Sequence, residues 1–182
     1  MTQKFQNKYR IASARLKDWD YGSNAIYFVT ICTQNREHYF GEIIGGTMKL
    51  NAIGELVQKY WIEIPNHFPF VQLHEFVVMP NHVHSIIEIN RKTADAPQLN
   101  GDIVKTPKLG VSTGKWKPGV LGVIINQYKR ICTINARKTN PKFAWQSRFH
   151  DHIIRDFDSY HRIEQYIQNN PARWKEDEYT SP

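Results

Sequence analysis

Two histidines separated by one residue stand in a stretch with the composition of a buried strand, HEFVVMPNHVHSIIEI. A strand alternates its side chains, so His82 and His84 would point to one face and Val83 to the other. Neutral imidazoles coordinate Mn, Zn or Fe, and they bind Mg only with help from oxygen ligands. One histidine packed in the core and one facing water would give the same pattern. A second such pair, His150 and His152, shows how common the pattern is.

A tyrosine and an amide near the C-terminus, in YIQNNP, could complete such a site. Tyr166 and Asn170 are four residues apart, so in a helix they project from one face and could offer a nucleophile and a neutral oxygen ligand. A tyrosine at helical spacing with Ile163 and Ile167 is also typical of a core position. Tyr128, in NQYKR, is the competing nucleophile, but it falls on an apolar stripe, so packing explains it.

The hydrophobic periodicity predicts seven elements that would position these side chains. They are a strand over 25–33, a helix over 51–64, two strands over 73–89 joined at Pro80-Asn81, a helix over about 120–138, a strand over 145–156, and a helix over 158–170 entered at Asp158 or Ser159. This order predicts an α+β, ferredoxin-like split βαββαβ fold. We expect a four-stranded antiparallel sheet with helices on one face, plus a C-terminal helix that carries Tyr166.

The length and composition predict one domain over residues 1–182. The 182 residues are 41% hydrophobic, which suffices for one core. No apolar run is long enough to span a membrane and the N-terminus has no secretory signal pattern, so we expect a cytoplasmic protein. Cys32 and Cys132 fit reduced core residues. Residues 90–120 lose the periodicity and predict a long, flexible, basic loop, and 171–182 a C-terminal tail.

The charge favours a polyanionic partner, with nucleic acid as the leading candidate, because the net charge is +7 and the pI about 9.4. The candidate phosphate contacts are Lys129, Arg130, Arg137 and Lys138 in the second helix, Lys105, Lys108, Lys115 and Lys117 in the loop, and Arg155 with His152 in the last strand. For any single lysine, a solvated surface position is an equally simple explanation. Trp116 and Trp174 could stack on unpaired bases, and Trp174 could instead seal the end of the last helix.

In this order, five segments make the chain resemble the single-tyrosine HUH transposases, where U is a hydrophobic residue, and most closely their REP-associated tyrosine transposase branch. The segments are YFVTICTQNREHYFG, VVMPNHVHSIIEI, LGVIINQYKR, WQSRFHDHIIRD and YIQNNPARWKEDEY, and together they cover nearly the whole chain. The resemblance implies cleavage and rejoining of single-stranded or hairpin DNA through a 5′-phosphotyrosine and a free 3′-hydroxyl.

The same resemblance implies a role for each candidate residue. His82 and His84 would be ligands of a divalent metal, Mg²⁺ or Mn²⁺, with Tyr166 as nucleophile and Asn170 as the third ligand. Insertion-sequence relatives usually carry Gln at that amide position, so Asn170 departs from their pattern while suiting the REP-associated branch. Relatives include both dimers and monomers, so a homodimer and a monomer both stay open.

Three other classes of function remain. A domesticated, non-catalytic protein that binds a DNA hairpin could keep the fold, although the intact candidate site argues against it. An RNA-binding ferredoxin-like domain would carry a K/R-G-F/Y-G/A-F pattern, which does not occur here. A metal-dependent hydrolase would differ in that DNA never becomes attached to the protein.

Overall fold

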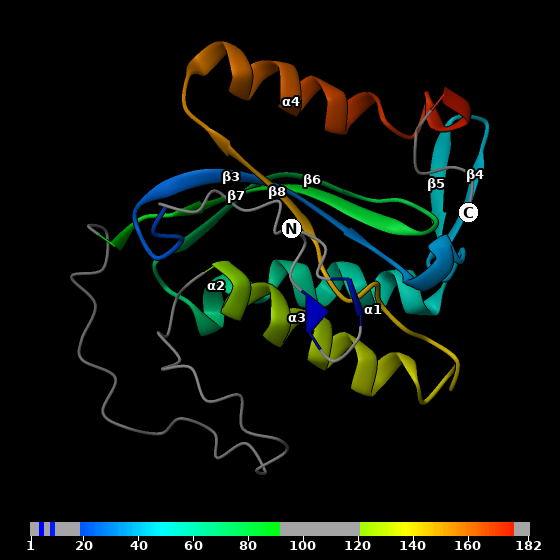
Figure 1. Ribbon diagram of the computed structural model, residues 1–182. Helices are drawn as coiled ribbons and strands as arrows, with labels where there is room; N and C mark the ends of the chain where they lie inside the picture. Colours follow the sequence, from blue (N-terminus) through cyan, green and yellow to red (C-terminus); the bar gives the residue numbers. More distant parts are fainter. Residues whose placement is uncertain (1–3, 6–7, 10–18, 92–120, 177–182) are drawn as a thin grey trace.

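A four-stranded antiparallel sheet forms the centre of the computed structural model, which describes residues 4–5, 8–9, 19–91 and 121–176 (Figure 1). Its strands are β3 (Ala25–Cys32), β6 (Val71–Val78), β7 (His82–Ile89) and β8 (His150–Ile154), in the spatial order β6-β7-β3-β8. Consecutive β6 and β7 form a hairpin, and Met79 N–H donates to the His82 carbonyl across Pro80-Asn81. The predicted sheet and the predicted tight turn are both confirmed.

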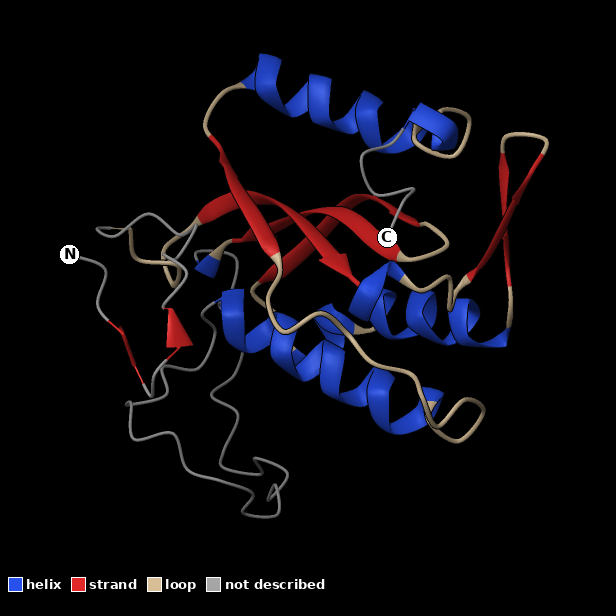
Figure 2. Ribbon diagram, turned by 45° about the vertical axis from the view of Figure 1, so that its right-hand side comes forward, coloured by secondary structure: helices blue, strands red, loops and turns tan. Residues whose placement is uncertain are grey.

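Helices cover both faces of this sheet (Figure 2). On one face lie α1 (Ala52–Ile62), the short α2 (Ile64–His67) and α3 (Leu121–Ala136), and α1 and α3 pack against each other. The helix α4 (Phe157–Asn169) lies across the other face, against β6 and β7. The α+β class and the additional C-terminal helix are therefore confirmed.

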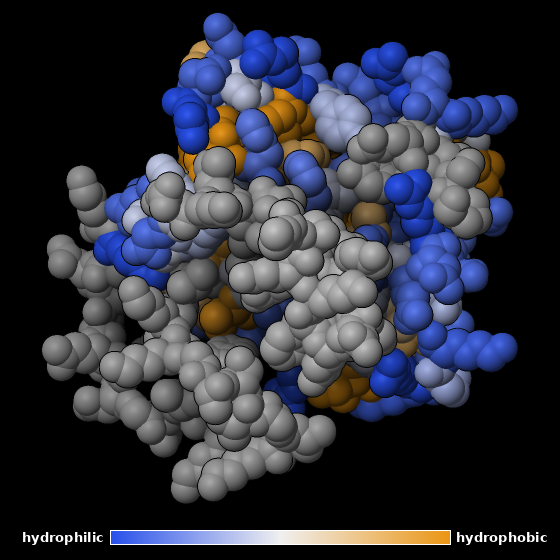
Figure 3. Space-filling view, in the orientation of Figure 1, coloured by the Kyte–Doolittle hydropathy of each residue, from blue (hydrophilic) through white to orange (hydrophobic). Residues whose placement is uncertain are grey.

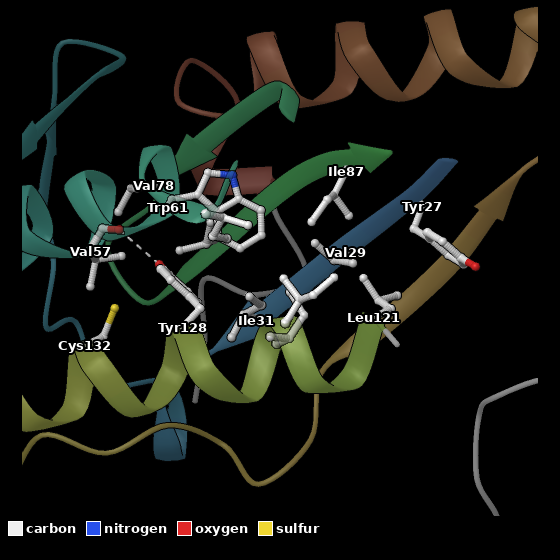
Figure 4. Close-up of a cluster of buried hydrophobic side chains, with 14 of the residues drawn as sticks. Tyr27, Val29, Ile31, Val57, Trp61, Val78, Ile87, Leu121, Tyr128 and Cys132 are labelled. Atoms are coloured by element: carbon white, nitrogen blue, oxygen red, sulfur yellow. Dashed lines mark hydrogen bonds between the residues drawn. The ribbon is translucent and has the colours of Figure 1, made fainter. Parts of the chain in front are cut away.

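The main hydrophobic core lies between the sheet and the α1–α3 layer (Figure 4). Alternate residues of β3, Tyr27, Val29 and Ile31, are fully buried there, as the strand periodicity requires. Trp61 of α1 and Tyr128 of α3 meet edge to face, with ring centroids 4.9 Å apart. Most of the large buried side chains lie in this core, and their packing holds the sheet against α1 and α3.

A second, smaller cluster lies between the sheet and α4. Its buried members are Ile86, Ile154 and Ile167, one each from β7, β8 and α4. Figure 3 shows apolar surface beside α4, bordered by hydrophilic side chains. The strand residues that alternate with the main core face this side, so the even-numbered positions of β7, including His82 and His84, look toward α4.

Three details differ from the prediction. The α4 helix begins at Phe157, because the Asp156 carboxylate caps it by accepting the Ser159 N–H at 2.7 Å, rather than Asp158 or Ser159 marking its entry. The last strand is limited to β8, and Trp145 forms only an isolated bridge with Thr33. A hairpin of β4 (Gly41–Ile44) and β5 (Thr47–Leu50) was not predicted.

Other predictions fall at the ends or outside the described part of the chain. Residues 92–120 of the predicted basic loop and residues 177–182 of the tail lie outside the described residues, whereas 171–176 form a turn and a 3-10 helix over Trp174–Glu176. Short strands β1 (Lys4–Phe5) and β2 (Lys8–Tyr9) pair with each other. None of the helices described is long and apolar enough to cross a membrane. Cys32 and Cys132 are both buried.

Candidate metal and nucleophile site

The two histidines of β7 form the centre of the candidate site. His82 and His84 are 0% and 1% exposed, and their ring centroids are 4.3 Å apart. They lie on the face of the sheet that α4 covers, as the alternation of the strand predicts. Two imidazole rings in contact are unusual in a buried position, so the chemistry of the pair depends on the hydrogen-bond partner of each ring nitrogen.

His82 is held by the residue that precedes it. Its Nδ1 lies 2.8 Å from Asn81 Oδ1, and the amide nitrogen of Asn81 donates to the Arg36 carbonyl at 3.0 Å. Burial lowers the pKa of His82 to about 3, and the positive charges of Arg36 and His38 act in the same direction. The imidazole is therefore neutral at physiological pH, which is the form that binds metal ions.

His84 is bonded at both ring nitrogens. Thr30 Oγ1, opposite it on β3, lies 2.9 Å from Nδ1, and the Tyr166 hydroxyl lies 3.1 Å from Nε2. A phenol is the stronger donor of this pair of groups, so Tyr166 donates and His84 Nε2 accepts. The proton of a neutral His84 then sits on Nδ1, directed at Thr30.

Tyr166 is the only one of these side chains with substantial exposure. It projects from α4 with 42% of its surface accessible, and its ring packs edge to face on Phe28 at 6.1 Å. The chain separation between Tyr166 and His84 is 82 residues, so the fold, not local sequence, creates the contact. A phenolic oxygen beside a buried imidazole and open to a large substrate is suited to nucleophilic attack.

Tyr128, the competing nucleophile, lies on the opposite face of the sheet. Its hydroxyl donates to the Val57 carbonyl at 3.2 Å, and its ring packs on Trp61 (Figure 4). Burial raises its pKa well above the usual value. A phenol that is 3% exposed and bonded inside the main core cannot reach a DNA backbone, so the position of Tyr128 is explained by packing.

The end of α4 and the residues after it run over the histidine pair, and Asn170 belongs to this segment. Tyr166 contacts His84, and Trp174 lies 6.0 Å from the His82 ring and 5.7 Å from His38, measured between centroids. Asn170 stands midway between these two contacts, ends α4 as its C-cap, and is 3% exposed. A buried amide on the segment that crosses both histidines fits a third oxygen ligand.

This donor set suits a divalent metal ion. Within the described residues no group of three or more His, Cys, Asp or Glu side chains could hold a metal. The amide oxygen of Asn170 stays the predicted third ligand beside the two imidazoles. Two neutral nitrogens and one amide oxygen suit Mn²⁺, and Mg²⁺ would need further oxygens from water or phosphate. The pair of imidazoles with bonded Nδ1 atoms is the arrangement that metal-binding histidines usually show.

The candidate phosphate contacts are divided between the two faces. On α3, opposite the histidines, Lys129 donates to the Gln146 and Arg148 carbonyls, and Arg130 is exposed. The helix ends at Ala136, so Arg137 and Lys138, which were predicted within it, lie in the turn that follows. Arg137 donates to the Phe143 carbonyl at 2.9 Å, and Lys138 is exposed. The lysines predicted in the loop, Lys105, Lys108, Lys115 and Lys117, lie outside the described residues, as does Trp116.

Arg155 stands at the other end of α4 from Tyr166. It follows β8 and lines a cavity of about 620 Å³ together with His152 and Arg162. Arg155 is thus a predicted basic residue that lies at the border of the sheet face covered by α4. Arg162 was not selected from the sequence, because a single arginine in an amphipathic helix carries no signal of its own.

Sequence reasoning also missed Thr30 and Asn81, the partners of the two Nδ1 atoms. Asn81 was interpreted only as a turn former, although its place immediately before His82 was a usable signal. Thr30 is 54 residues from His84 and becomes its neighbour through strand pairing, so nothing in the local sequence marks it.

The fold is that of a solved transposase structure. No family model matches the sequence. The structure of the REP-associated tyrosine transposase bound to a REP hairpin is similar to this chain with a TM-score of 0.52 and 19% identity, over 90% of this chain and 74% of that chain. The described elements thus have a single-tyrosine transposase-like fold.

A close relative in sequence defines the family. A protein of Haemophilus influenzae, described only as uncharacterized, is 42% identical over 169 residues, which are 91% of this chain and 91% of that protein. The chain belongs to the same family as this Haemophilus protein.

Proposed function

We propose that the protein is a metal-dependent single-tyrosine HUH transposase that cuts and rejoins single-stranded or hairpin DNA. The observation that carries the proposal is the 3.1 Å contact between the Tyr166 hydroxyl and His84 Nε2, which joins the candidate nucleophile to the candidate metal ligands across the fold. The REP hairpin in the similar transposase structure supports hairpin DNA as the substrate class.

In the proposed reaction, the Tyr166 oxygen attacks the phosphorus of one DNA phosphodiester. The bond from phosphorus to O3′ breaks, the phenol loses its proton, and O3′ gains one, which leaves a 5′-phosphotyrosine and a 3′-hydroxyl. Attack by a 3′-hydroxyl on the phosphotyrosine reverses these changes and joins DNA. The covalent bond conserves the energy of the phosphodiester, so joining needs no further cofactor.

His82, His84 and Asn170 would hold a divalent metal, which supplies charge neutralisation and orientation of the scissile phosphate when bound. The sheet fixes both imidazoles, while Tyr166 stays half exposed where a DNA strand can approach. The lone pair of His84 Nε2 serves either the phenol or a metal, because one lone pair cannot serve both. In the metal-free state it keeps the Tyr166 hydroxyl in place above the pair.

Phosphate contacts along the α4 face would come from Arg155. DNA that extends past the edge of the sheet would also contact Lys129 and Arg130 of α3 and Arg137 and Lys138 of the turn after it. Lys115 and Lys117 complete the proposed set. Each such contact replaces condensed counterions, so it contributes to affinity in a salt-dependent way. Sequence selection would need contacts to bases in addition.

The test is covalent capture of DNA. The protein is incubated with Mn²⁺ and labelled hairpin DNA taken from beside its own gene, and a denaturing gel shows whether label migrates with protein. We expect an adduct with the wild type and none with Tyr166→Phe or with a chelator. Tyr160→Phe, which changes a second tyrosine of the same helix, is the matched control and should keep the adduct.

Other outcomes select other functions. An adduct that persists in Tyr166→Phe would show that Tyr166 is not the nucleophile. Cleavage without any adduct would indicate a hydrolase. Tight hairpin binding with neither cleavage nor adduct would favour the alternative, a domesticated non-catalytic protein that binds DNA hairpins.

A further inference from the structure

The turn that follows β3 contains two residues in a conformation that non-glycine residues rarely adopt. Asn35 and Arg36, in the 3-10 turn Gln34–Arg36 after β3, both have φ of 52°. Such left-handed positions are strained for a residue with a side chain, so surrounding contacts must hold them. The contact at this point is with Asn81: the Arg36 carbonyl accepts its amide N–H at 3.0 Å.

The same turn holds the backbone of Asn81. Its carbonyl accepts both the Thr33 N–H, at 2.8 Å, and the Thr33 hydroxyl, at 3.0 Å. Asn81 is 0% exposed, so its side chain cannot reorient through solvent. The turn and the β6–β7 connection therefore form one hydrogen-bonded unit that fixes Asn81 at backbone and side chain.

These contacts determine which end of the Asn81 amide faces His82. Because the amide nitrogen faces the Arg36 carbonyl, the amide oxygen must face His82 Nδ1, at 2.8 Å. An oxygen acceptor at Nδ1 requires that Nδ1 carry the ring proton. His82 is then held in the Nδ1–H tautomer, and the lone pair lies on Nε2.

A corresponding arrangement serves the second histidine. Thr30 Oγ1 lies 2.9 Å from His84 Nδ1, and the Tyr166 phenol donates to Nε2. Thr30 is 1% exposed and sits directly opposite His84 in the register of β3 and β7. With the phenol as donor, His84 also carries its proton on Nδ1, and the rings of both histidines lie on the α4 side of the sheet.

We infer that Asn81 and Thr30 are positioning residues: Asn81 sets the tautomer of His82, Thr30 accepts from His84 Nδ1 and fixes that ring, and together they aim both Nε2 lone pairs at one metal ion. The inference rests on the proposed function in one respect, that a metal occupies the Nε2 side. Partners of this kind fix ring orientation and raise ligand basicity, and losing one typically weakens metal binding by roughly 10- to 100-fold.

The first experiment reads the tautomers of the metal-free protein. Long-range ¹H–¹⁵N correlation spectra of the imidazole rings at neutral pH distinguish the protonated from the unprotonated nitrogen, and His82→Gln assigns the signal among the eight histidines. We expect Nδ1–H for His82 in the wild type and in Asn81→Asp, which keeps an oxygen acceptor. We expect Asn81→Ala to lose this single tautomer. An Nε2–H ring in the wild type would overturn the inference.

The second experiment measures Mn²⁺ binding by calorimetry without DNA. Asn81→Ala and Thr30→Val should bind Mn²⁺ roughly 10- to 100-fold more weakly. Thr30→Ser, which keeps the hydroxyl, should stay near the wild type. Thr133→Val is the matched control, because it removes a threonine hydroxyl that donates to the Lys129 carbonyl in α3, on the opposite face of the sheet; its Mn²⁺ affinity should equal that of the wild type. A purely structural role of Asn81 and Thr30 would lower the thermal stability of Asn81→Ala and Thr30→Val and leave the Mn²⁺ affinity of both unchanged.

The two proposals fail separately. If the tautomers are as inferred but no DNA adduct forms, strand transfer fails and the positioning role holds. If the adduct forms and Asn81→Ala keeps both its tautomer and its Mn²⁺ affinity, the positioning role is overturned and strand transfer stands. Excess Mn²⁺ should restore adduct formation by Thr30→Val, because this variant loses metal affinity and keeps the nucleophile.

Discussion

Removing the Tyr166 hydroxyl should tighten metal binding in the absence of DNA. The reason is competition: His84 Nε2 accepts from the phenol at 3.1 Å in the metal-free protein, and this bond must break before the same lone pair can bind a metal. Tyr166→Phe keeps the ring and its edge-to-face contact with Phe28 but removes the competitor.

The size of the effect follows from the hydrogen bond. A neutral intramolecular hydrogen bond contributes about 0.5–1.5 kcal/mol net, and water competes for a side chain that is 42% exposed, so the lower half of that range applies. A gain of about 0.5–1 kcal/mol corresponds to roughly 2- to 5-fold tighter binding of Mn²⁺ at room temperature.

Calorimetric titration of the DNA-free protein with Mn²⁺ measures this directly. Tyr160→Phe is the control, since the Tyr160 hydroxyl bonds His74 Nδ1 at 3.2 Å and so makes a similar contact from the same helix away from the site. Its Mn²⁺ affinity should equal that of the wild type. Weaker binding by Tyr166→Phe would refute the reasoning and make the phenol itself a metal ligand, and equal binding would remove His84 Nε2 from the ligand set.

Three further predictions concern the core, the pH dependence and DNA binding. Tyr128→Phe should lower the free energy of unfolding by about 1 kcal/mol, measured by urea denaturation, and leave DNA adduct formation intact, because its hydroxyl donates to the Val57 carbonyl inside the main core, on the face opposite the histidines. His82 has a folded pKa of about 3, below its unfolded value of about 6.5, so its contribution to stability is present above pH 6.5 and is lost as the pH falls toward 3. His82→Gln should reduce the slope of unfolding free energy against pH in that window by up to about 1.4 kcal/mol per pH unit, and an unchanged slope would contradict the burial argument. Arg155→Ala should lower the salt dependence of hairpin binding by about one unit in the log–log plot, while Arg130→Ala on the opposite face should change it less.

The fold could be predicted from the sequence where burial imposes a period. β3 and β7 are buried on both faces, and α1 and α3 have one apolar side, so their extents follow from side-chain type alone. The β4–β5 hairpin was missed although Gly45-Gly46, with φ of 59° and 76°, is a recognisable turn sequence. Each of its strands has only four residues, a run too short for the polar–apolar alternation of Thr47–Leu50 to indicate a strand by itself.

The site could be predicted only in part, and the reason is chain separation. His82 with His84, and Tyr166 with Asn170, are each close in sequence, so strand and helix geometry place the members of each pair on a common face. The two pairs are brought together only because α4 crosses the sheet. The sequence analysis could include this arrangement only through the family resemblance.

The proposed chemistry needs metal ligands with a fixed geometry and a nucleophile that can meet DNA, and different parts of the fold provide the two. Metal ligands must keep a fixed geometry, and both histidines are buried in a central strand with the large main core on its other face. The nucleophile must meet a DNA strand, and Tyr166 is carried by a helix that the smaller cluster of Ile86, Ile154 and Ile167 holds to the sheet. Because little apolar area fixes α4, changes in this cluster should alter the placement of Tyr166 at a smaller cost in global stability than equal changes in the main core. Ile167→Ala should therefore reduce the rate of adduct formation while His82 keeps its Nδ1–H tautomer, since both histidines and their Nδ1 partners belong to the sheet and its connections.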